Sequence, residues 1–330
     1  MTYEQAIATI ENKLQAIKYP AQAAELYEPI AYLLALKGKK VRPALTLLAC
    51  NLYQEDIEKA VDMALAWEIF HNFTLMHDDV MDQADVRRGQ PTVHKKWDEN
   101  TAILSGDAML ILAYQYVAKT GAHPEQGVCD TSLRELLDLF STTAAEICEG
   151  QQLDMAFENR LDVQEAEYLN MIRLKTAVLL GASLKSGAII GGANAQDAEL
   201  MYDFGVNLGV AFQIQDDLLD VYGDAAVFGK KIGGDILANK KTYLSVNALN
   251  TTDAILKKSY LLWLEYNAGE ATKIDNVTTI YNRLGLKEKA RQAMDSYFQK
   301  ALKALEQVNV PAEKKSVLKQ LATDLMNRNS

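Results

Sequence analysis

Cysteine, proline and glycine are scarce in this sequence of 330 residues, which contains 3, 6 and 18 of them, respectively. So few glycines and prolines are unlike an all-β protein, in which tight turns recur along the chain. The cysteines, Cys50, Cys129 and Cys148, are odd in number and lack the spacing of a metal site. We therefore expect them to be buried free thiols of a protein in a reducing compartment.

Long uninterrupted apolar runs are also missing. Residues 1–20 carry several acidic side chains and indicate an amphipathic start, not a signal peptide. The most hydrophobic segment, 176–193, is interrupted by Lys185 and is short for a bilayer span. Its glycines indicate a buried helix that packs closely on its neighbours. We expect a cytoplasmic protein without a transmembrane segment.

Positive charge is in deficit, with 34 Lys and Arg against 44 Asp and Glu, for a net charge of −10. A nucleic-acid partner is therefore not expected, because duplex binding requires a basic face. An acidic chain can still bind an anionic ligand where metal ions invert the local charge.

Helical periodicity, by contrast, runs almost from end to end, through stretches rich in Ala, Leu, Glu, Lys and Gln. No Ser/Gly/Pro-rich linker interrupts it, and no alternation of strands with helices is present. The pattern predicts a single all-α domain over residues 1–330. We expect the breaks between helices at 19–22, 36–43, 86–92, 120–127, 193–197, 222–236 and 266–275.

One acidic motif occurs twice: DDVMD begins at Asp78 and DDLLD begins at Asp216. Within a helix, the first and last aspartates of each motif share a face, and the second points roughly 100° away. A single motif of this kind is as often a solvated helix face. Both copies have apolar flanks, however, and buried carboxylates must be paired or bound to metal. If the two faces meet, hard divalent cations such as Mg²⁺ are the natural partners, together with phosphate oxygens.

Basic residues cluster beside glycine and proline in GKKVRP (38–43) and VRRGQPTVHKKW (86–97). Any one of them alone is most simply a surface charge. Arginine, however, forms fork-like pairs of hydrogen bonds with phosphate. Acidic and basic motifs together in an acidic helical protein indicate a diphosphate ligand, held partly through metal ions and partly directly.

These motifs follow one another in the order found in trans-isoprenyl diphosphate synthases, and the chain resembles this polyprenyl synthetase family. The resemblance covers residues 30–245 by motif and rests on GKKVRP, DDVMDQADVRRGQPTVH, KT at 175–176, FQIQDDLLD and GKKIGGDI…NKKTY. It implies the isoprenoid synthase fold, a bundle of long helices around a deep central cavity, and a homodimer.

The resemblance also implies a role for the residues of these motifs. The metal ligands would be the aspartates of both motifs: Asp78, Asp82, Asp216 and Asp220. Three Mg²⁺ ions are implied, two at the first motif and one at the second. The allylic diphosphate would be bound by these metals and by basic side chains: Arg87, Lys175 and Lys230. Isopentenyl diphosphate would be bound by a second set: Lys39, Arg42, His71 and Arg88.

Further positions follow from the same resemblance. Thr176 and Gln213 would present oxygens to the developing cation, and Lys240 would help to hold the leaving group. In the lysine pair at 230–231 either residue could bind phosphate, and we prefer Lys230 because it directly follows Gly229.

The implied chemistry is the condensation of isopentenyl diphosphate with an allylic diphosphate. Diphosphate leaves once its charge is neutralised, and stabilisation of developing charge is usually the largest catalytic term. The double bond of isopentenyl diphosphate attacks the allylic cation, and the released diphosphate takes up the proton. Because no side-chain base is needed, no Ser/His/Asp or Cys/His arrangement is expected. Water must be excluded, since it would quench the cation.

Product length is expected to depend on the residues that precede the first motif. Thr74 and Phe70 lie four and eight residues before Asp78, beneath the acidic face of a helix, with Phe73 on the flank. In the family an aromatic residue four or five positions before the first aspartate resembles a floor that stops elongation, and small residues at both positions go with longer products; here Phe73 is bulky and Thr74 is small. We therefore expect a short product, C20 first and C15 next. The alternative is that both phenylalanines are simply core residues.

Two other functions remain possible. A class I terpene cyclase shares this fold and metal chemistry but needs only one diphosphate site, so Lys39, Arg42 and Arg88 argue against it. A non-catalytic regulatory subunit would tend to lose one aspartate motif, and both are complete here.

Overall fold

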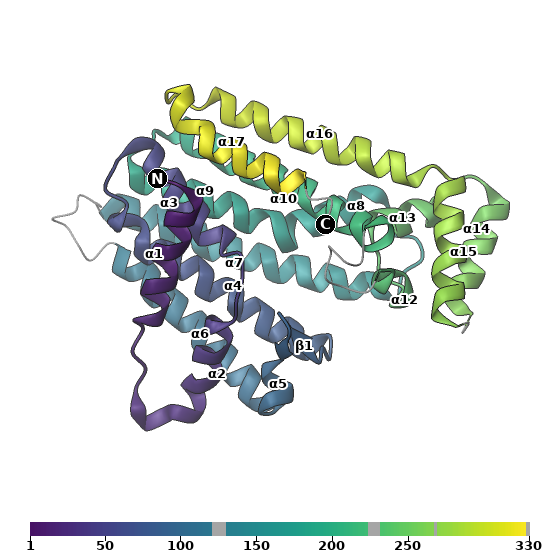
Figure 1. Cartoon of the computed structure of the whole chain (residues 1–330), viewed down its shortest axis with the longest axis horizontal. Helices are drawn as coiled ribbons and strands as arrows, with labels where there is room; N and C mark the ends of the chain where they lie inside the picture. The colour runs from purple at the N-terminus through teal and green to yellow at the C-terminus, as the bar shows by residue number, and fades with distance from the viewer. Residues whose placement is uncertain (121–129, 224–231, 267–268, 328–330) are drawn as a thin grey trace. The chain divides into compact units, whose positions relative to one another are not determined.

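The computed structural model describes residues 1–120, 130–223, 232–266 and 269–327. Apart from one short hairpin, the secondary structure of these residues is helical (Figure 1), and the prediction of an all-α protein is confirmed. The chain folds as two compact units. Unit 1 comprises residues 1–141, 182–201 and 309–318, and unit 2 comprises 142–181, 202–308 and 319–330. The single domain over 1–330 stays a prediction.

Unit 1 contains the N-terminal elements. They are α1 (Tyr3–Gln15), η1 (Ala21–Ala23), α2 (Ala24–Ala35), α3 (Val41–Tyr53), η2 (Glu58–Ala60), α4 (Val61–Met81), β1 (Val86–Arg87), β2 (Gln90–Pro91), α5 (Val93–Lys96) and α6 (Glu99–Thr120). Further helices contribute segments to both units: α7 (Asp130–Glu158), α9 (Val178–Gly191), α10 (Ala195–Tyr222) and α17 (Ala312–Met326).

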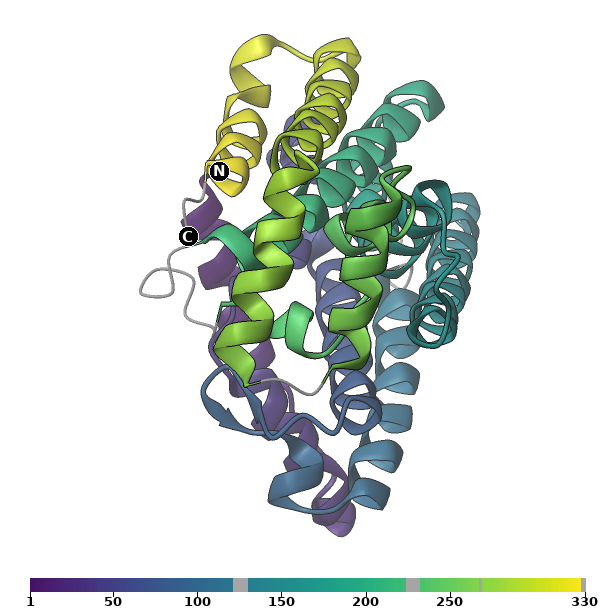
Figure 2. The same cartoon turned by 90° about the vertical axis from the view of Figure 1, so that its right-hand side faces the viewer.

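The central helix of unit 1 is α4, which packs along α6 (Figure 1 and Figure 2). Its Trp67 is fully buried, donates from Nε1 to Ser186 Oγ of α9 at 2.9 Å, and stacks on Phe140 of α7 at 4.8 Å between ring centroids. Small residues also permit α9 to pack closely on α3, because a Cβ added to Gly187 would lie 2.1 Å from the carbonyl oxygen of Thr46. The interior of unit 1 therefore fixes the helix that carries the first aspartate motif.

Unit 2 contains the C-terminal elements. They are α8 (Glu165–Ile172), the π-helical turn η4 (Arg173–Ala177), α12 (Gly234–Leu237), α13 (Tyr243–Leu249), α14 (Ala254–Glu265), α15 (Glu270–Arg283) and α16 (Leu286–Gln307). Helices α14 and α15 pack side by side (Figure 2). One apolar core joins these helices to the unit-2 segment of α10, which carries the second aspartate motif.

The glycine-rich segment 176–193 packs closely on its neighbours, as the sequence predicts. A Cβ on Gly205 of α10 would lie 2.7 Å from the Cα of Gly181, and one on Gly209 would lie 2.7 Å from the Cα of Ala177. Within unit 2, α10 therefore approaches the start of α9 and the turn η4 through small residues. Gly192, whose φ is +92°, directly follows α9 and adopts a conformation that most residues disfavour.

The cysteine prediction is confirmed only in part. Cys50 is buried, Cys148 is exposed, and Cys129 lies outside the described residues. The expectation of burial is wrong for Cys148 because α7 turns Thr143 and Ile147 inward, and Cys148 lies on its other face.

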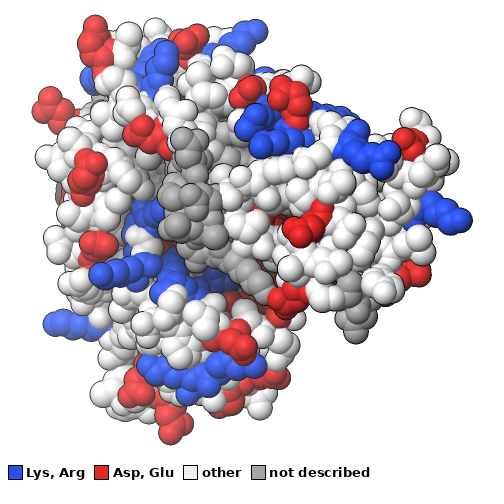
Figure 3. All heavy atoms as spheres, turned by 45° about the vertical axis from the view of Figure 1, so that its right-hand side comes forward, with Lys and Arg blue, Asp and Glu red and all other residues white. Residues whose placement is uncertain are grey.

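Two helical stretches, 99–120 and 165–191, are long and apolar enough to cross a membrane by length and composition. The most apolar window of the second is 72% buried inside the protein, as expected for a core helix, and such stretches are weak indications of membrane spans. Acidic and basic side chains both occur across the face drawn in Figure 3, in keeping with the mixed composition.

Candidate active site

The first aspartate motif lies at the end of α4, and its second member differs from the other two. Asp78 is half-buried and Asp82 is exposed. Asp79 is only 3% exposed and accepts two hydrogen bonds from Arg87, from Nε at 2.7 Å and from Nη2 at 2.6 Å. Such a bidentate pair is strong and geometrically specific. Asp79 therefore anchors Arg87, and the metal-ligand prediction concerns the two outer aspartates.

Arg87 and Arg88 belong to a hairpin that the sequence analysis did not predict. Strands β1 and β2 pair in antiparallel register, with Arg87 opposite Gln90. The two residues between them, Arg88 and Gly89, have φ values of +53° and +75°. Positive φ at both central positions is the mark of a type I′ turn, which fits the natural twist of a hairpin. Asn-Gly is the usual signal for this turn, so Arg-Gly in its place concealed it.

Three segments of unit 1 bring together a cationic cluster, defined as Lys40, Arg42, His71, Arg87 and Arg88. Arg42 Nη1 lies 3.1 Å from His71 Nε2. Arg88 Nη1 donates to Asn72 Oδ1 at 3.5 Å. Gly38 lies against the same guanidinium, since an added Cβ would be 2.9 Å from Arg88 Cζ. The fold thus gathers three of the four residues expected at isopentenyl diphosphate, together with Arg87.

The fourth, Lys39, is exposed in the loop between α2 and α3, and its carbonyl accepts a hydrogen bond from Tyr3 Oη at 2.6 Å. This contact ties the loop to α1. The next residue, Lys40, has a φ of +46° and precedes the first residue of α3. The GKKVRP loop is therefore tied to α1 at Lys39, and Arg42 lies in the first turn of the helix that follows.

Burial shapes the electrostatics of the cluster. The pKa of His71 lies well below its usual value, first because of desolvation and then because Arg42, Arg88 and Arg87 are near. Burial also lowers the pKa of Arg42 to about 10. His71 is therefore neutral at physiological pH, and its Nε2 accepts a hydrogen bond from Arg42, which can only donate.

Protonation of His71 is expected to make the fold acid-sensitive. In the unfolded chain this imidazole takes up a proton below about pH 6.5, whereas the buried imidazole stays neutral until a lower pH. Stability is therefore retained above pH 6.5 and falls below it, with a slope of at most about 1.4 kcal/mol per pH unit from this group. The free energy of unfolding in urea, measured between pH 7.5 and pH 5.5, should fall less steeply with decreasing pH for His71→Gln than for the wild type. Equal slopes would contradict the assignment.

The proposed product-length residues have different surroundings. Phe70 is 1% exposed and packs on Phe140 and Trp67, with centroid distances of 5.3 and 6.4 Å. Phe73 is half-buried, and its ring meets His77 edge-on at 4.8 Å. Thr74 is also half-buried, and its hydroxyl donates to the carbonyl of His71 at 2.8 Å. Phe70 is thus a core residue, whereas Phe73 keeps an accessible edge.

In unit 2, Lys175 and Thr176 lie in the π-helical turn η4 (Arg173–Ala177), where the N–H of Val178 bonds to the carbonyl of Arg173. Such wide turns are frequent at functional sites. Lys175 Nζ donates to Asp154 Oδ2 at 2.6 Å, and Thr176 Oγ1 donates to Gln213 Oε1 at 3.5 Å. The structure therefore brings together Thr176 and Gln213, as the resemblance implies.

Gly150 of α7 makes room for this turn, and its replacement tests the contact. A Cβ at Gly150 would lie 2.4 Å from the backbone nitrogen of Lys175. Because a backbone atom has little freedom to move away, Gly150→Ala is expected to destabilise the fold by about 1–3 kcal/mol. Thermal denaturation measures the effect. Glu149→Ala, on the exposed face of the same helix, is the control, and equal melting temperatures for the two variants would contradict the clash.

The second aspartate motif resembles the first in its buried middle aspartate but differs in its last one. Asp217 is 3% exposed and accepts from the backbone N–H of Tyr243 at 2.8 Å and from the hydroxyl of Tyr168. Burial raises its pKa to about 7. Asp216 is half-buried. Asp220 is buried, and its Oδ2 accepts from the N–H of Asp235 at 3.1 Å, beside α12.

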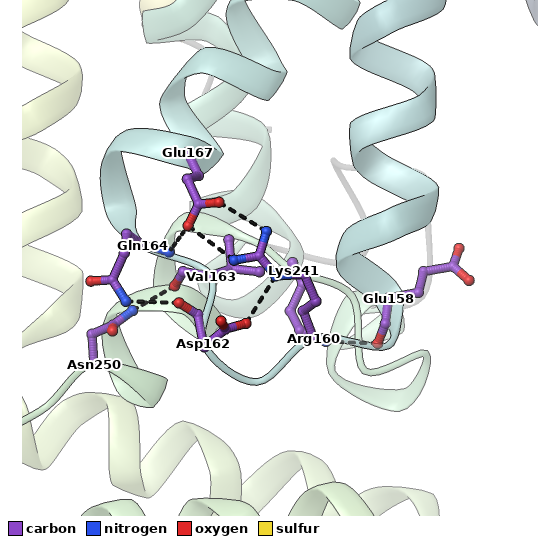
Figure 4. A network of polar contacts seen from close by, with 8 residues as sticks. All are labelled: Glu158, Arg160, Asp162, Val163, Gln164, Glu167, Lys241 and Asn250. Atoms are coloured by element: carbon purple, nitrogen blue, oxygen red, sulfur yellow. Dashed lines mark hydrogen bonds and ion pairs between the residues drawn. The ribbon is translucent and has the colours of Figure 1, made fainter.

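Of the two remaining predicted lysines, only Lys240 is among the described residues, and it follows α12. Lys240 is exposed. Its neighbour Lys241 is buried and donates to the carbonyl of Glu158 at 3.0 Å (Figure 4). In the same network, Arg160 pairs with Asp162 and Glu167 and stiffens the loop between α7 and α8. Lys241 therefore ties the segment between α12 and α13 to the C-terminal end of α7. Lys230 and the alternative Lys231 lie outside the described residues.

The carboxylates fit Mg²⁺ better than a metal with a complete protein cage. Among the described residues, no group of three or more His, Cys, Asp and Glu side chains is arranged to hold a metal ion. Asp79 and Asp217 are already engaged by Arg87 and Tyr168. Mg²⁺ typically takes one or two carboxylates and completes its shell with water and phosphate oxygens. Asp78, Asp82 and Asp216 are half-buried or exposed and would fit that requirement, whereas Asp220 is buried beside α12.

The helical fold and the two aspartate motifs are those expected of a trans-prenyltransferase, and comparison with known proteins establishes this class of enzyme. Residues 23–284 match the polyprenyl synthetase family. A geranylgeranyl diphosphate synthase from Sulfolobus acidocaldarius is 38% identical over 285 residues, 86% of this chain and 85% of that protein. A geranylfarnesyl diphosphate synthase from Natronomonas pharaonis is 40% identical over 265 residues, 74% and 76% of the two chains.

A solved structure described as a geranylgeranyl pyrophosphate synthase superposes with a TM-score of 0.93 at 43% sequence identity and covers 100% of both chains. The chain belongs to the polyprenyl synthetase family. The predicted family, isoprenoid synthase fold and trans-prenyltransferase class are confirmed. Enzymes of this family generally depend on Mg²⁺.

Proposed function

We propose that this enzyme condenses isopentenyl diphosphate with C5–C15 allylic diphosphates and releases C20 geranylgeranyl diphosphate as its main product, with C15 farnesyl diphosphate next. The observation that carries the proposal is the cationic cluster, which supplies basic side chains for a second diphosphate in addition to the aspartate motif. A terpene cyclase would have no use for that second site. The two relatives, a geranylgeranyl and a geranylfarnesyl diphosphate synthase, support a short-chain product.

Unit 1 would bind isopentenyl diphosphate. Arg42, Arg88 and the exposed Lys39 would contact its diphosphate, and neutral His71 would hold Arg42 in place. Arg87, fixed by Asp79, would contact the allylic diphosphate. Fork-like guanidinium groups suit both tasks, because each can donate two parallel hydrogen bonds to phosphate oxygens.

Carboxylates, through Mg²⁺, and lysine side chains would assist the departure of the allylic diphosphate. Asp78 and Asp82 in unit 1, and Asp216 with Asp220 in unit 2, would be the Mg²⁺ ligands, with three ions implied. Mg²⁺, when bound, neutralises charge on the diphosphate and makes it a better leaving group. By the family resemblance alone, Lys175, Lys240 and Lys230 are proposed as ligands of the allylic diphosphate.

The carbocation would be stabilised by neutral oxygens. Thr176 and Gln213 already lie within hydrogen-bond distance of each other in unit 2. Their oxygen lone pairs would stabilise the positive charge without trapping it covalently. The new carbon–carbon bond forms as the double bond of isopentenyl diphosphate attacks, and the proton that is lost goes to the released diphosphate.

A cytoplasmic homodimer is part of the proposal. Helix α6 exposes large apolar side chains, namely Ile103, Leu104 and Ile111, with exposed fractions of 44%, 60% and 60%. Neighbouring exposed apolar side chains of this kind are typical of an interface between subunits. A second copy of the chain is the partner that the family resemblance implies.

Product analysis tests the function directly. Purified enzyme is incubated with Mg²⁺, radiolabelled isopentenyl diphosphate and each of the C5, C10 and C15 allylic diphosphates. We expect a linear C20 product from all three primers and none after chelation of Mg²⁺. A cyclic product formed without isopentenyl diphosphate would identify a cyclase. If the chain alone released no diphosphate, a regulatory subunit would be favoured instead.

A further inference from the structure

A buried carboxylate lies behind the cationic cluster and has no role in the function derived so far. Glu68 of α4 is 2% exposed, in a stretch of helix that is otherwise apolar. A buried charge is costly unless it is paired and hydrogen-bonded. Glu68 Oε1 accepts from Lys40 Nζ at 2.9 Å and from Asn72 Nδ2 at 2.9 Å. Its charge is therefore compensated by two groups from different segments.

The first of these contacts fixes the GKKVRP loop. Lys40 is 6% exposed, and its Nζ also donates to the carbonyl of Leu34 at 3.4 Å. These two contacts hold the Lys40 ammonium group inside the protein, so it is unsuited to contact substrate. The left-handed backbone at Lys40 starts α3, two residues before Arg42. The ion pair with Glu68 therefore fixes the backbone position from which the Arg42 side chain extends.

The second contact orients Asn72. Because the amide nitrogen of Asn72 donates to both the carboxylate and the carbonyl of Glu68, at 2.9 and 2.8 Å, its oxygen must face the other way. That oxygen accepts from Arg88 Nη1 at 3.5 Å. A chain of polar contacts thus runs from Glu68 through Asn72 to a second arginine of the cluster.

Charge balance explains why an acid is present beside an anion site. The cluster contains four cations, Lys40, Arg42, Arg87 and Arg88, while His71 is neutral. Glu68 and Asp79 are the carboxylates paired with them. Four positive and two negative charges leave two positive charges, which suits a diphosphate. Glu68 also favours the charged forms of Arg42 and Arg88 against the cost of burial.

We propose that Glu68 is a positioning residue: through Lys40 and Asn72 it sets Arg42 and Arg88 at the spacing that binds the diphosphate of isopentenyl diphosphate. The inference rests on the proposed function for the identity of the ligand. Glu68 itself does not touch the substrate. Its effect is on the geometry of the cluster, and this separates the proposal from a merely electrostatic role.

Glu68→Gln distinguishes these roles, because the two predict opposite changes. Loss of positioning raises the KM for isopentenyl diphosphate, and we expect about a tenfold increase or more, since small displacements of binding groups are costly. Loss of negative charge alone would leave the cluster more positive and would lower this KM. The KM for the allylic substrate and the kcat at saturation of both substrates should stay nearly unchanged. A lower KM for isopentenyl diphosphate would overturn the proposal.

Two further variants guard against simple destabilisation. Ser186→Ala removes the hydrogen bond of Trp67, one residue before Glu68, and serves as the matched control. If Glu68→Gln changed both KM values in the same way as this control, the role would be structural only. If Glu68→Gln fails to fold, Lys40→Met/Glu68→Met replaces the whole pair by apolar groups, which proteins often tolerate. A wild-type KM for isopentenyl diphosphate in the double variant would overturn the proposal.

Binding of inorganic diphosphate gives a readout independent of catalysis. Calorimetric titration in the presence of a chelator measures the cationic cluster without metal ions. We expect weaker binding to Glu68→Gln than to the wild type, and unchanged binding to Ser186→Ala. If the wild-type chain made no product from isopentenyl diphosphate, the proposed function would fail, and this titration would still decide the role of Glu68. Equal affinities would reject that role.

Discussion

Replacing Asp82 with asparagine is expected to lower kcat/KM by about a thousandfold, the size of effect seen when one strong electrostatic contact to the reacting group is lost. Asp82 is exposed, so the fold should keep its stability to within about 0.5 kcal/mol. Because Asp82 is proposed as a Mg²⁺ ligand, its replacement should also raise the Mg²⁺ concentration needed for half-maximal rate. Initial rates measured across a Mg²⁺ series test both effects.

The control for Asp82 lies in the same motif. Asp79→Asn changes the same atoms but removes the buried partner of Arg87, whose side chain is 25% exposed. We expect a loss of about 2 kcal/mol in unfolding free energy, less than for a fully buried pair because water reaches Arg87. Urea unfolding of both variants separates the two roles. A stable Asp79→Asn, or a fully active Asp82→Asn, would show that the roles are assigned wrongly.

Replacing Phe73 with alanine is expected to shift the main product from C20 to C25 or longer. The ring of Phe73 is half-buried, so its removal opens space beside the acidic face of α4 at moderate cost to stability. A further C5 unit can be added when the growing prenyl chain extends past the position of the Phe73 ring. Chromatography of dephosphorylated products, with the C15 primer and excess isopentenyl diphosphate, measures the change.

Phe70→Ala is the matched control, because Phe70 differs from Phe73 mainly in burial. Its ring is enclosed by Phe140 and Trp67, so truncation should cost about 3–5 kcal/mol of stability. If product length were unchanged in Phe73→Ala but increased in Phe70→Ala, the floor would lie at the deeper residue. The helical-wheel argument that placed Phe70 and Thr74 nearest to the motif would then be correct.

Helical spacing alone predicted how the acidic motifs are organised. Residues four apart share a face, and the second aspartate points away from it, as Asp79 and Asp217 do. What sequence could not supply was the partner of each turned-away carboxylate. Arg87 is eight residues from Asp79 along the chain, but Tyr243 is 26 residues from Asp217. Long-range contacts of this kind leave no local pattern.

Local exceptions to regular structure were also missed. The break between α3 and α4 (54–60) and the one between α7 and α8 (159–164) carry little glycine or proline, so nothing marked them. Lys40 read as one more basic loop residue, yet it is buried. A signal was present in α4, where Glu68 and Asn72 interrupt an apolar face four residues apart and indicate a buried cation nearby.

The π-helical turn at Arg173–Ala177 holds one residue more than a regular helix would need. Deleting any residue within it would restore α-helical pairing, shorten the segment by about 1.5 Å and rotate α8 by roughly 100° against α9. The apolar faces of the two helices could then no longer both stay buried. A deletion here would therefore displace Lys175 and Thr176 and disturb the core at the same time. Natural variants should tolerate exchange of side chains in this turn far better than a change in its length.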